Sequence, residues 1–394
     1  MKAVELSAKW DPKPNFKLGF KDIEGKLTYL GSQVWRYPEV KVVDNKVKPK
    51  ILPNEVMIKV NRCGICGSDV HMLQTYDDGY IYYPGLTAFP VVLGHEFAGE
   101  IVEVGNKAFS KRTGKLYEVG EPVTVEEMVW CGECKPCCDG YPNHCERLQE
   151  IGFSIDGAYA EYIAVPAKLC WSLKKLEKQY SDIYKIGSLV EPTSVAYNAV
   201  IERGGGIRPG ENVVILGGGP IGLAAASILK FAGAGVCIIS EPDTNRANLA
   251  KKVGSVDYTI NPMKESFVEK VKEYTDNEGA ALYLEATGLP HVVTDDIQNA
   301  IWECKAVNST VVIVARAEQR MPVCGEYFQV RRARIVGAQG HSGHGTFPNV
   351  INCMAAGMDI TPIITKEITL EEVPENIAKL QTDRENCKIS AKIA

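Results

Sequence analysis

The spacing of hydrophobic and polar residues predicts β-strands in the first part of the chain. Residues 1–6 alternate weakly and residues 55–60 alternate regularly, while apolar runs cover residues 91–93 and 97–104. Alternation with a period of two places one set of side chains on the buried face of a sheet. A further strand is predicted over residues 152–165, so this region is expected to form a β-rich domain.

A different pattern follows residue 192, where short apolar runs alternate with helical segments. The runs lie at residues 212–216, 236–240, 282–284, 311–315 and 334–337. Strands that are apolar on both faces are typical of a parallel sheet covered by helices on each side. We therefore predict a doubly wound α/β domain over residues 193–332, and we expect residues 1–192 and 333–394 to form the β-rich domain.

A glycine-rich turn follows the first of these runs. It reads Gly217-Gly218-Gly219-Pro220-Ile221-Gly222 and leads into a helix over residues 223–231. This context is typical of a Rossmann dinucleotide-binding domain, in which the backbone approaches a pyrophosphate at a helix N-terminus. The alternative is a glycine-rich turn without a ligand.

Glu241 follows the next strand, 19 residues after Gly222. Its carboxylate can accept hydrogen bonds from both hydroxyls of an adenine ribose, and it would repel a 2′-phosphate. The sequence therefore predicts NAD rather than NADP as the cofactor. The predicted cofactor-binding residues are Gly217, Gly219, Pro220, Ile221, Gly222, Glu241 and Arg246.

Residues that can bind a metal gather in two stretches of the β-rich domain. Cys66 lies in the run Cys63-Gly64-Ile65-Cys66-Gly67-Ser68-Asp69-Val70-His71, and His95 and Glu96 interrupt an apolar run. Thiolate, imidazole and carboxylate are ligands of zinc, and three firm ligands leave a fourth position open for chemistry. Taken singly, Ser68 could only cap the turn, and His71 could only be a surface histidine.

A second group of cysteines lies in a glycine- and proline-rich lobe, residues 130–146. Its members are Cys131, Cys134, Cys137 and Cys145. Four thiolates at such short spacings can close on one tetrahedral zinc with no open position, which predicts a structural site. The alternative is a set of buried free thiols.

Composition and charge narrow the class of protein. The 394 residues suggest two or three domains, and their composition is that of an ordinary globular protein. The net charge of −5 gives no electrostatic reason to bind nucleic acid or an anionic membrane. No signal peptide is recognisable, and no stretch approaches the ~18 apolar residues of a membrane span. Thirteen cysteines without a secretion signal favour the reducing cytoplasm.

Together these motifs resemble the zinc-containing alcohol dehydrogenases of the medium-chain dehydrogenase/reductase family. The signature reads Gly94-His95-Glu96-x2-Gly99-x5-Gly105-x2-Ala108, and the other motifs match in order over nearly the whole chain. The resemblance implies a GroES-like catalytic domain with a structural zinc lobe, joined to the Rossmann domain. The chain departs from the family in the segment over residues 9–50, which is longer than is usual in the family. It departs again at Met72, where the family commonly has an aromatic residue.

The resemblance also implies a zinc site of the polyol dehydrogenase branch. Cys66, His95 and Glu96 are the implied ligands of the catalytic zinc. Glu191, in the segment Glu191-Pro192-x-Ser194-Val195, resembles the glutamate of that branch that binds the metal or its water. Simple-alcohol enzymes usually have cysteine there. Whether Glu96 or Glu191 is the direct ligand stays open.

The implied catalytic residues beside the metal move the proton. Ser68 and His71 resemble a relay that leads from the alcohol, through the nicotinamide ribose hydroxyl, to solvent. Asp69 resembles the carboxylate that orients a ligand imidazole. The implied reaction is the oxidation of a secondary hydroxyl with hydride transfer to NAD.

The implied substrate is a small polyol or keto-polyol, including cyclic polyols such as an inosose. Sorbitol, butanediol and L-threonine dehydrogenases share the motifs and remain alternatives. An alternative of another class is a zinc-ribbon interaction protein, which the acidic net charge disfavours. The family resemblance suggests a homodimer or homotetramer without nucleic-acid or membrane partners.

Three segments have no assigned role. Residues 9–50 and the tyrosine-rich loop at residues 74–90 are interpreted as surface segments, the second of which could shape a substrate pocket. His341 and His344 lie in a glycine-rich stretch, which we expect to be an exposed loop rather than a metal site.

Overall fold

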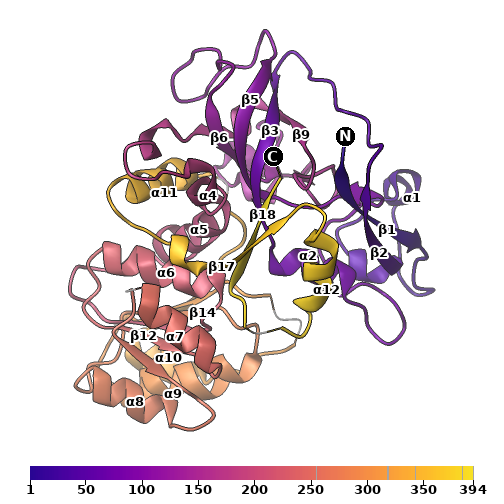
Figure 1. The fold of residues 1–394 in the computed structure, drawn as a ribbon. Helices are drawn as coiled ribbons and strands as arrows, with labels where there is room; N and C mark the ends of the chain where they lie inside the picture. Colours follow the sequence, from indigo (N-terminus) through magenta and orange to yellow (C-terminus); the bar gives the residue numbers. More distant parts are fainter. Residues whose placement is uncertain (254, 317–318, 342, 384, 394) are drawn as a thin grey trace. The chain divides into compact units, whose positions relative to one another are not determined.

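The computed structural model describes residues 1–253, 255–316, 319–341, 343–383 and 385–393. The chain divides into two compact units. The first comprises Met1–Glu191 and Ile364–Ala394, and the second comprises Pro192–Ile363. In Figure 1 the first unit therefore contains the indigo and magenta segments together with the yellow strands at the C-terminal end.

The first unit is built around a mixed sheet with the order β10-β6-β5-β3-β18-β17, in which β9 also pairs with β3. The bounds are β3 (Glu55–Gly64), β5 (Glu96–Val104), β6 (Pro122–Val125), β9 (Tyr162–Pro166), β10 (Cys170–Ser172), β17 (Ile364–Thr369) and β18 (Lys388–Lys392). A smaller sheet has the order β2-β1-β4, with β1 (Ala3–Trp10), β2 (Trp35–Val43) and β4 (Val91–Val92). The strand predicted over residues 152–165 is shorter than expected and begins only at Tyr162.

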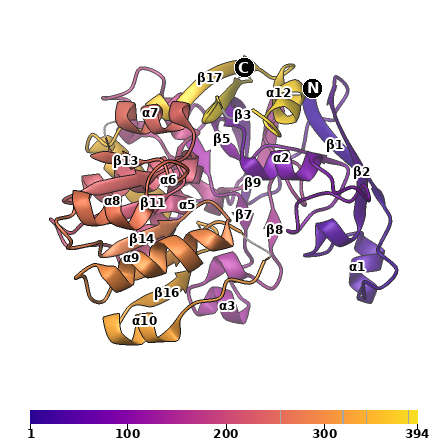
Figure 2. The same cartoon turned by 90° about the horizontal axis from the view of Figure 1, so that it is seen from below.

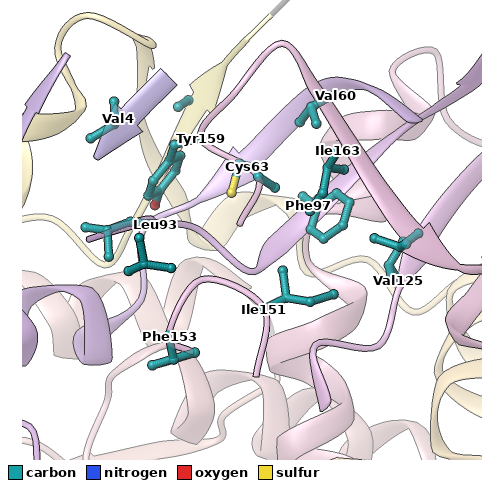
Figure 3. Close-up of a cluster of buried hydrophobic side chains, with 14 of the residues drawn as sticks. Val4, Val60, Cys63, Leu93, Phe97, Val125, Ile151, Phe153, Tyr159 and Ile163 are labelled. Carbon is teal, nitrogen blue, oxygen red and sulfur yellow. The ribbon is translucent and has the colours of Figure 1, made fainter. Parts of the chain in front are cut away.

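The alternating strands of this unit bury one apolar core. Figure 3 shows part of this core, where Phe97 of β5 lies near Ile163 of β9 and Val60 of β3. Phe97 is fully buried, and burial of such a side chain stabilises the fold by about 1.5–3 kcal/mol. The core therefore fixes the ends of β3 and β5, from which the candidate site projects.

Short helices and a small ribbon complete the first unit. The helices are α1 (Phe20–Gly25), α2 (Gly67–Leu73), α3 (Lys135–Cys138), α4 (Ile183–Gly187) and α12 (Val373–Lys379), with the shorter turns η1 (Gly31–Gln33), η2 (Pro142–His144), η3 (Ala167–Leu169) and η4 (Lys174–Leu176). The ribbon is formed by β7 (Met128–Val129) and β8 (Gln149–Glu150), which pair at the base of the four-cysteine lobe. The helix α5 (Val190–Tyr197) spans the division between the units.

The second unit contains a parallel sheet with the order β13-β12-β11-β14-β15-β16. Its strands are β11 (Val213–Leu216), β12 (Cys237–Ser240), β13 (Tyr258–Ile260), β14 (Leu282–Glu285), β15 (Thr310–Ile313) and β16 (Arg334–Gly337). This order is that of a Rossmann sheet, in which ligands bind where the order reverses, at the carboxyl ends of β11 and β14. The predicted Rossmann fold is therefore confirmed.

Helices of the second unit pack in two groups. The helices α6 (Pro220–Phe231) and α7 (Thr244–Val253) contact each other, and α8 (Phe267–Tyr274), α9 (Gln298–Glu303) and α10 (Gly325–Arg331) form the other group (Figure 2). The remaining elements are η5 (Asn198–Arg203), η6 (Val292–Ile297), α11 (Thr346–Ala355) and η7 (Thr361–Ile363).

The second boundary differs from the predicted one. The chain returns to the first unit at Ile364 rather than at residue 333. The reason is that β16 pairs in parallel with β15 and so belongs to the Rossmann sheet, although its sequence lies beyond the predicted domain end.

Candidate functional site

The pairing of β3 with β5 brings Cys66, His95 and Glu96 together. Gly64 at the end of β3 lies opposite Glu96 at the start of β5. Cys66, which follows β3, and His95, which precedes β5, therefore meet at the same end of these two strands. One ligand atom each from Cys66, His95 and Glu96 lies within 4.8 Å of the other two. The predicted ligands of the catalytic zinc therefore lie close enough to share one ion.

The close approach of the strands depends on the glycine at position 64. A Cβ atom built on Gly64 would lie 2.3 Å from Glu96 Oε2, far inside contact distance. Any other residue at this position would push the carboxylate away from the cluster. The Cys63-Gly64-Ile65-Cys66 motif thus has a steric reason for its glycine.

The surroundings of His95 stabilise positive charge. Burial by itself would lower the pKa of His95, but hydrogen bonding to Cys66 and the charges of Cys66, Asp69 and Glu191 raise this pKa well above its usual value. His95 Nδ1 lies 3.9 Å from Asp69 Oδ1, and its ring packs against Phe153 with centroids 4.7 Å apart. A buried pocket that favours a proton on an imidazole also suits a metal cation.

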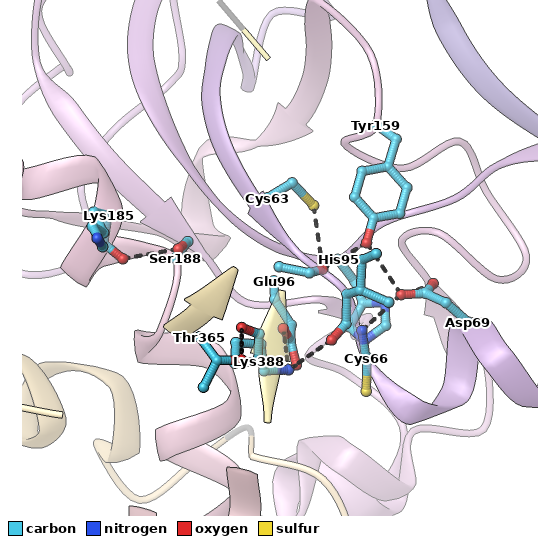
Figure 4. A network of polar contacts seen from close by, with 12 residues as sticks. Cys63, Cys66, Asp69, His95, Glu96, Tyr159, Lys185, Ser188, Thr365 and Lys388 are labelled. Atoms are coloured by element: carbon cyan, nitrogen blue, oxygen red, sulfur yellow. Dashed lines mark hydrogen bonds and ion pairs between the residues drawn. The ribbon is translucent and has the colours of Figure 1, made fainter. Parts of the chain in front are cut away.

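Asp69 lies behind His95, as the resemblance implied. Its Oδ2 atom accepts a hydrogen bond from the backbone N–H of Cys66 at 2.9 Å and lies 3.4 Å from the hydroxyl of Tyr159 (Figure 4). The Tyr159 hydroxyl donates to Gly64 O at 2.7 Å. Burial raises the pKa of Asp69, and the charge on His95 acts in the opposite direction.

Glu96 has a partner that the sequence did not indicate. Lys388 Nζ donates to both carboxylate oxygens of Glu96 at 2.6 Å and to Ile65 O at 2.9 Å (Figure 4). Burial raises the pKa of Glu96, whereas the charge of Lys388 lowers it. Lys388 could not be found from the sequence, because a single lysine in a C-terminal strand carries no signal of a partner 292 residues away.

Glu191 lies near this cluster without joining it. Its charge raises the pKa of both His95 and Glu96, so the carboxylate lies near both residues. One of its oxygens lies within 4.8 Å of a carboxylate oxygen of Glu127, a buried residue that the sequence analysis did not single out. Two neighbouring buried carboxylates would repel each other in the absence of a cation or proton.

The two residues of the predicted relay lie on α2. Ser68 and His71 are three positions apart and therefore share one face of the helix. Ser68 Oγ is buried and has no hydrogen-bond partner among the described residues, whereas His71 is exposed. A buried hydroxyl without a partner is costly, which is consistent with a hydroxyl that meets a bound molecule.

The tyrosine-rich loop packs beside His71. The rings of Tyr76 and Tyr82 stack with centroids 4.3 Å apart, and the Tyr82 ring centroid lies 6.1 Å from that of His71. The loop is therefore folded onto α2. The histidine-containing segment at residues 341–344 differs from expectation in part: His344 is exposed, but His341 is buried with its ring 5.0 Å from that of Phe347. Ser342 lies outside the described residues.

The four cysteines of the lobe converge on one point. One sulfur of each lies within 4.8 Å of the others: Cys131, Cys134, Cys137 and Cys145. Backbone N–H groups of Glu133 and Cys134 donate to Cys131 Sγ, which lowers the pKa of Cys131 to about 6. Burial raises the pKa of Cys137 to about 12, so four thiolates at this point require a cation. The lobe therefore fits a structural zinc.

The glycine-rich turn of the second unit is shaped for a phosphate-bearing ligand. A Cβ atom on Gly222 would lie 1.9 Å from Gly217 O, so only glycine allows α6 to begin this close to the turn. Nothing lies within 4 Å of a Cβ atom built on Gly219, the residue that precedes Pro220 and Ile221 in the first turn of α6. An open backbone at a helix N-terminus of this length is a favourable site for a pyrophosphate.

Glu241 lies beside this turn, and Arg246 lies at the start of α7. Glu241 is buried and accepts hydrogen bonds from the backbone N–H of Gly218 at 2.8 Å and of Asp243 at 2.9 Å. The Nε atom of Arg246 on α7 is buried without a hydrogen-bond partner among the described residues. The glycine-rich turn and Glu241 therefore lie at the carboxyl ends of the neighbouring strands β11 and β12, and the Nε atom of Arg246 could donate a hydrogen bond to a ligand.

Comparison with protein families identifies the class. Residues 52–175 match the family profile described as the alcohol dehydrogenase GroES-like domain, and residues 220–356 match the one described as zinc-binding dehydrogenase. The chain belongs to the zinc-containing medium-chain dehydrogenase/reductases and is an oxidoreductase. This confirms the predicted combination of a GroES-like domain with a Rossmann domain and gives no support to the zinc-ribbon alternative.

The chain is also similar to individual proteins of this family. It is 62% identical over 393 residues to the scyllo-inosose 3-dehydrogenase of Thermotoga maritima, with 99% of each chain covered. It is 37% identical over 251 residues to the L-threonine 3-dehydrogenase of Pyrococcus furiosus, which covers 64% of this chain and 66% of that one. A solved structure from Thermotoga maritima, described provisionally as an alcohol dehydrogenase, superimposes with a TM-score of 0.97, 61% identity and 99% coverage of both chains. Among the described residues, no helix is long and apolar enough to cross a membrane.

Proposed function

We propose that this dehydrogenase oxidises a secondary hydroxyl of a polyol, with a cyclic polyol such as an inosose as the preferred substrate and NAD as the acceptor. The observation that carries the proposal is the cluster of Cys66, His95 and Glu96 with the nearby carboxylate of Glu191. The identity of 62% along the whole chain to a scyllo-inosose 3-dehydrogenase supports the choice of substrate class and a place in inositol breakdown.

The residues of the first unit would hold one zinc through Cys66, His95 and a glutamate. Bound there, zinc would act as a Lewis acid that lowers the pKa of the substrate hydroxyl, and NAD would accept the hydride. Asp69 would orient His95 through electrostatic attraction, since its Oδ1 atom lies 3.9 Å from Nδ1 of the ring. The assignment of a second zinc to the four-cysteine lobe is supported by the convergence of its sulfur atoms.

The proton from the substrate hydroxyl would pass through α2. Ser68 Oγ, which has no partner among the described residues, would accept this proton while donating its own. His71, three residues later and exposed, would carry the proton from Ser68 to solvent.

The choice of NAD is supported by Glu241. A buried carboxylate already held by Gly218 N–H and Asp243 N–H has a fixed position at the end of β12. A ribose 2′-hydroxyl can donate to such a carboxylate, whereas a 2′-phosphate would be repelled by it.

We also propose a cytoplasmic homodimer or homotetramer. None of the cysteines in the described residues forms a disulfide bond, which suits a reducing compartment, and the family resemblance supports the assembly. Light scattering after size-exclusion chromatography would measure the mass of the assembly.

The substrate is tested by following NAD reduction with scyllo-inosose, myo-inositol, sorbitol, 2R,3R-butanediol and L-threonine under one set of conditions. The highest kcat/KM is expected for a cyclic polyol or inosose, and Cys66→Ala should abolish turnover while NAD binding survives. A clear preference for L-threonine or butanediol would remove the polyol assignment. Near-normal turnover by Cys66→Ala would remove the zinc mechanism as well.

A further inference from the structure

The first unit contains a cavity in the part of the chain that departs from the family pattern. Its volume is about 510 Å³, within the range of about 300–1,000 Å³ typical of small-molecule sites. Its walls come from residues 13–16, from Gln33 and Arg36, and from Asp78 and Tyr80. None of the residues assigned above to zinc, relay or NAD lines it.

Hydrogen bonds within the protein fix the part of the cavity wall formed by Arg36, Asp78 and Tyr80. Tyr80 donates from its hydroxyl to Asp11 O at 2.6 Å. The guanidinium of Arg36 donates to Asp78 O at 2.6 and 3.1 Å and to Asp11 Oδ2 at 3.0 Å. These bonds join β2, the segment after β1 and the tyrosine-rich loop, so the cavity is preformed rather than a gap between mobile loops.

Several polar groups of the cavity remain available to a ligand. Among the described residues, the side-chain amides of Asn15 and Gln33 make no hydrogen bond, and each offers both a donor and an acceptor. The Lys13 ammonium lies 3.4 Å from Asp78 Oδ2 and 4.5 Å from the centre of the Tyr80 ring, which leaves it further donors. Phe16 adds an apolar wall.

Both cations of the lining already have a carboxylate partner. Lys13 pairs with Asp78, and Arg36 pairs with Asp11, which lies just outside the lining. Neighbouring hydroxyl groups on a small ring match the paired donors and acceptors of two amides, and the C–H face of such a ring can pack against Phe16.

We propose that this cavity is a second small-molecule site, which binds a neutral polyhydroxylated molecule of the size of one sugar or cyclitol ring. The site is separate from the zinc cluster and does not depend on the proposed reaction. It lies against the tyrosine-rich loop, whose Tyr76 ring centre is 5.9 Å from Lys13 Nζ. The long segment over residues 9–50 thereby gains a role, because it supplies most of the lining.

The test is isothermal titration calorimetry of the full chain with myo-inositol as the neutral probe. Cys66→Ala should retain one saturable site, because the cavity contains no zinc ligand. Adding Asn15→Ala and Gln33→Leu to Cys66→Ala should weaken that binding at least about tenfold, as expected when hydrogen bonds to two amides are lost. Lys17→Ala, an exposed neighbour outside the lining, should leave the affinity unchanged.

Three results would overturn the proposal. They are the absence of saturable binding in Cys66→Ala, equal affinity with and without the two amide substitutions, and tighter binding of myo-inositol 1-phosphate than of myo-inositol. A melting temperature and an NAD affinity equal to those of the parent would show that the substituted protein is folded. If Asn15→Ala/Gln33→Leu impairs folding, the exposed Asn15→Ala alone is used, with a smaller loss of affinity expected. Failure of this second site leaves turnover of the polyol substrate intact, so the two proposals fail separately.

Discussion

The ammonium of Lys388 lies 2.6 Å from both carboxylate oxygens of Glu96, and both side chains are almost completely buried. The contact is possible because β3 lies between β5 and β18 and presents Gly64 at the point where the two side chains meet. The Lys388 side chain passes 3.4 Å from the Cβ position of Gly64. The charge of Glu96 is therefore compensated before any metal binds, and a metal that takes an oxygen of Glu96 must share it with Lys388 or displace it.

Replacing Lys388 by methionine is expected to destabilise the protein. Lys388→Met leaves the Glu96 carboxylate buried without its counter-charge, and removal of one partner of a buried pair costs about 3–5 kcal/mol in the free energy of unfolding. Urea denaturation measures this change. Lys392→Met, at an exposed position of the same strand, is the control and should change the free energy by less than about 0.5 kcal/mol.

The double variant Glu96→Gln/Lys388→Met separates charge from packing. It removes both charges, so it should recover a substantial part of the stability lost in Lys388→Met. A double variant as unstable as the sum of the single ones would show that the two charges do not interact.

Substitution of Gly64 should disrupt the metal cluster locally. In Gly64→Ala the new methyl group would lie 2.3 Å from Glu96 Oε2, so the carboxylate must move. We expect a loss of about one zinc per chain, measured by mass spectrometry of metals, together with a kcat lower by at least about tenfold. Gly67→Ala is the matched control, since nothing lies within 4 Å of its Cβ position and alanine favours a helix. Equal zinc contents in the two variants would contradict this role of Gly64.

Much of the site could be predicted from the sequence because its motifs are local. Cys131 and Cys134 lie in one turn of the chain, and the turn from Gly217 to Gly222 carries its own strand and helix signals. His95 and Cys66 lie 29 positions apart, but each follows or precedes a recognisable strand. In the lobe and the turn the spacing constrains the local geometry, whereas Cys66 and His95 meet only because β3 pairs with β5.

Other features depend on contacts that spacing does not encode. Lys388 reaches Glu96 only because β18 pairs with β3, a pairing set by the packing of the whole sheet. The predicted domain boundary at residue 333 was wrong because the apolar sequence of β16 does not show to which sheet the strand belongs. Only its pairing with β15 assigns it to the Rossmann sheet. His341 was expected in an exposed loop for a similar reason, since glycine-rich sequence reports flexibility of the backbone rather than burial.

Glu241 should determine the choice between NAD and NADP. Glu241→Gln keeps the shape of the side chain and removes its charge, so the ratio of kcat/KM for NADP to that for NAD should rise by about tenfold or more. Steady-state kinetics with both cofactors measures the ratio. Asp243→Asn, which changes a neighbouring carboxylate that accepts from Arg246 N, is the control and should shift the ratio much less. An unchanged ratio in Glu241→Gln would show that the charge of this carboxylate does not select NAD.

The four-cysteine lobe should lose its metal when one thiol is removed. Cys137→Ser is expected to lower the zinc content from two to one per chain and to lower the melting temperature, because a structural zinc contributes folding free energy directly. The exposed neighbour Cys138 provides a closely matched control, so Cys138→Ser should keep both zinc ions. Two zinc ions in Cys137→Ser would show that this sulfur is not a ligand.

The zinc-free protein should lose stability as the pH rises. Burial opposes the charge on His95, but Cys66, Asp69 and Glu191 raise its pKa well above the ordinary value of about 6.5. A pKa that is higher in the folded state than in the unfolded state stabilises the fold fully below about pH 6.5, and this contribution is lost as the pH rises through the folded-state pKa. Burial raises the pKa of Asp69 as well, which acts in the same direction from about pH 4 upward.

Zinc should reverse this dependence, because it binds the neutral imidazole and the thiolate and so competes with protons. The measurement is urea denaturation of zinc-free and zinc-loaded protein at intervals from about pH 6 to about pH 9. As the pH rises, the free energy of unfolding of the zinc-free form should fall, and the stabilisation by zinc should grow. His95→Asn should flatten the zinc-free profile, because it removes an imidazole whose pKa is raised by Cys66, Asp69 and Glu191. Two results would contradict this prediction: a free energy of unfolding of the zinc-free form that rises over this pH range, or a pH dependence that His95→Asn leaves unchanged. Either result would mean that the anionic groups around His95 do not favour a positive charge on its imidazole.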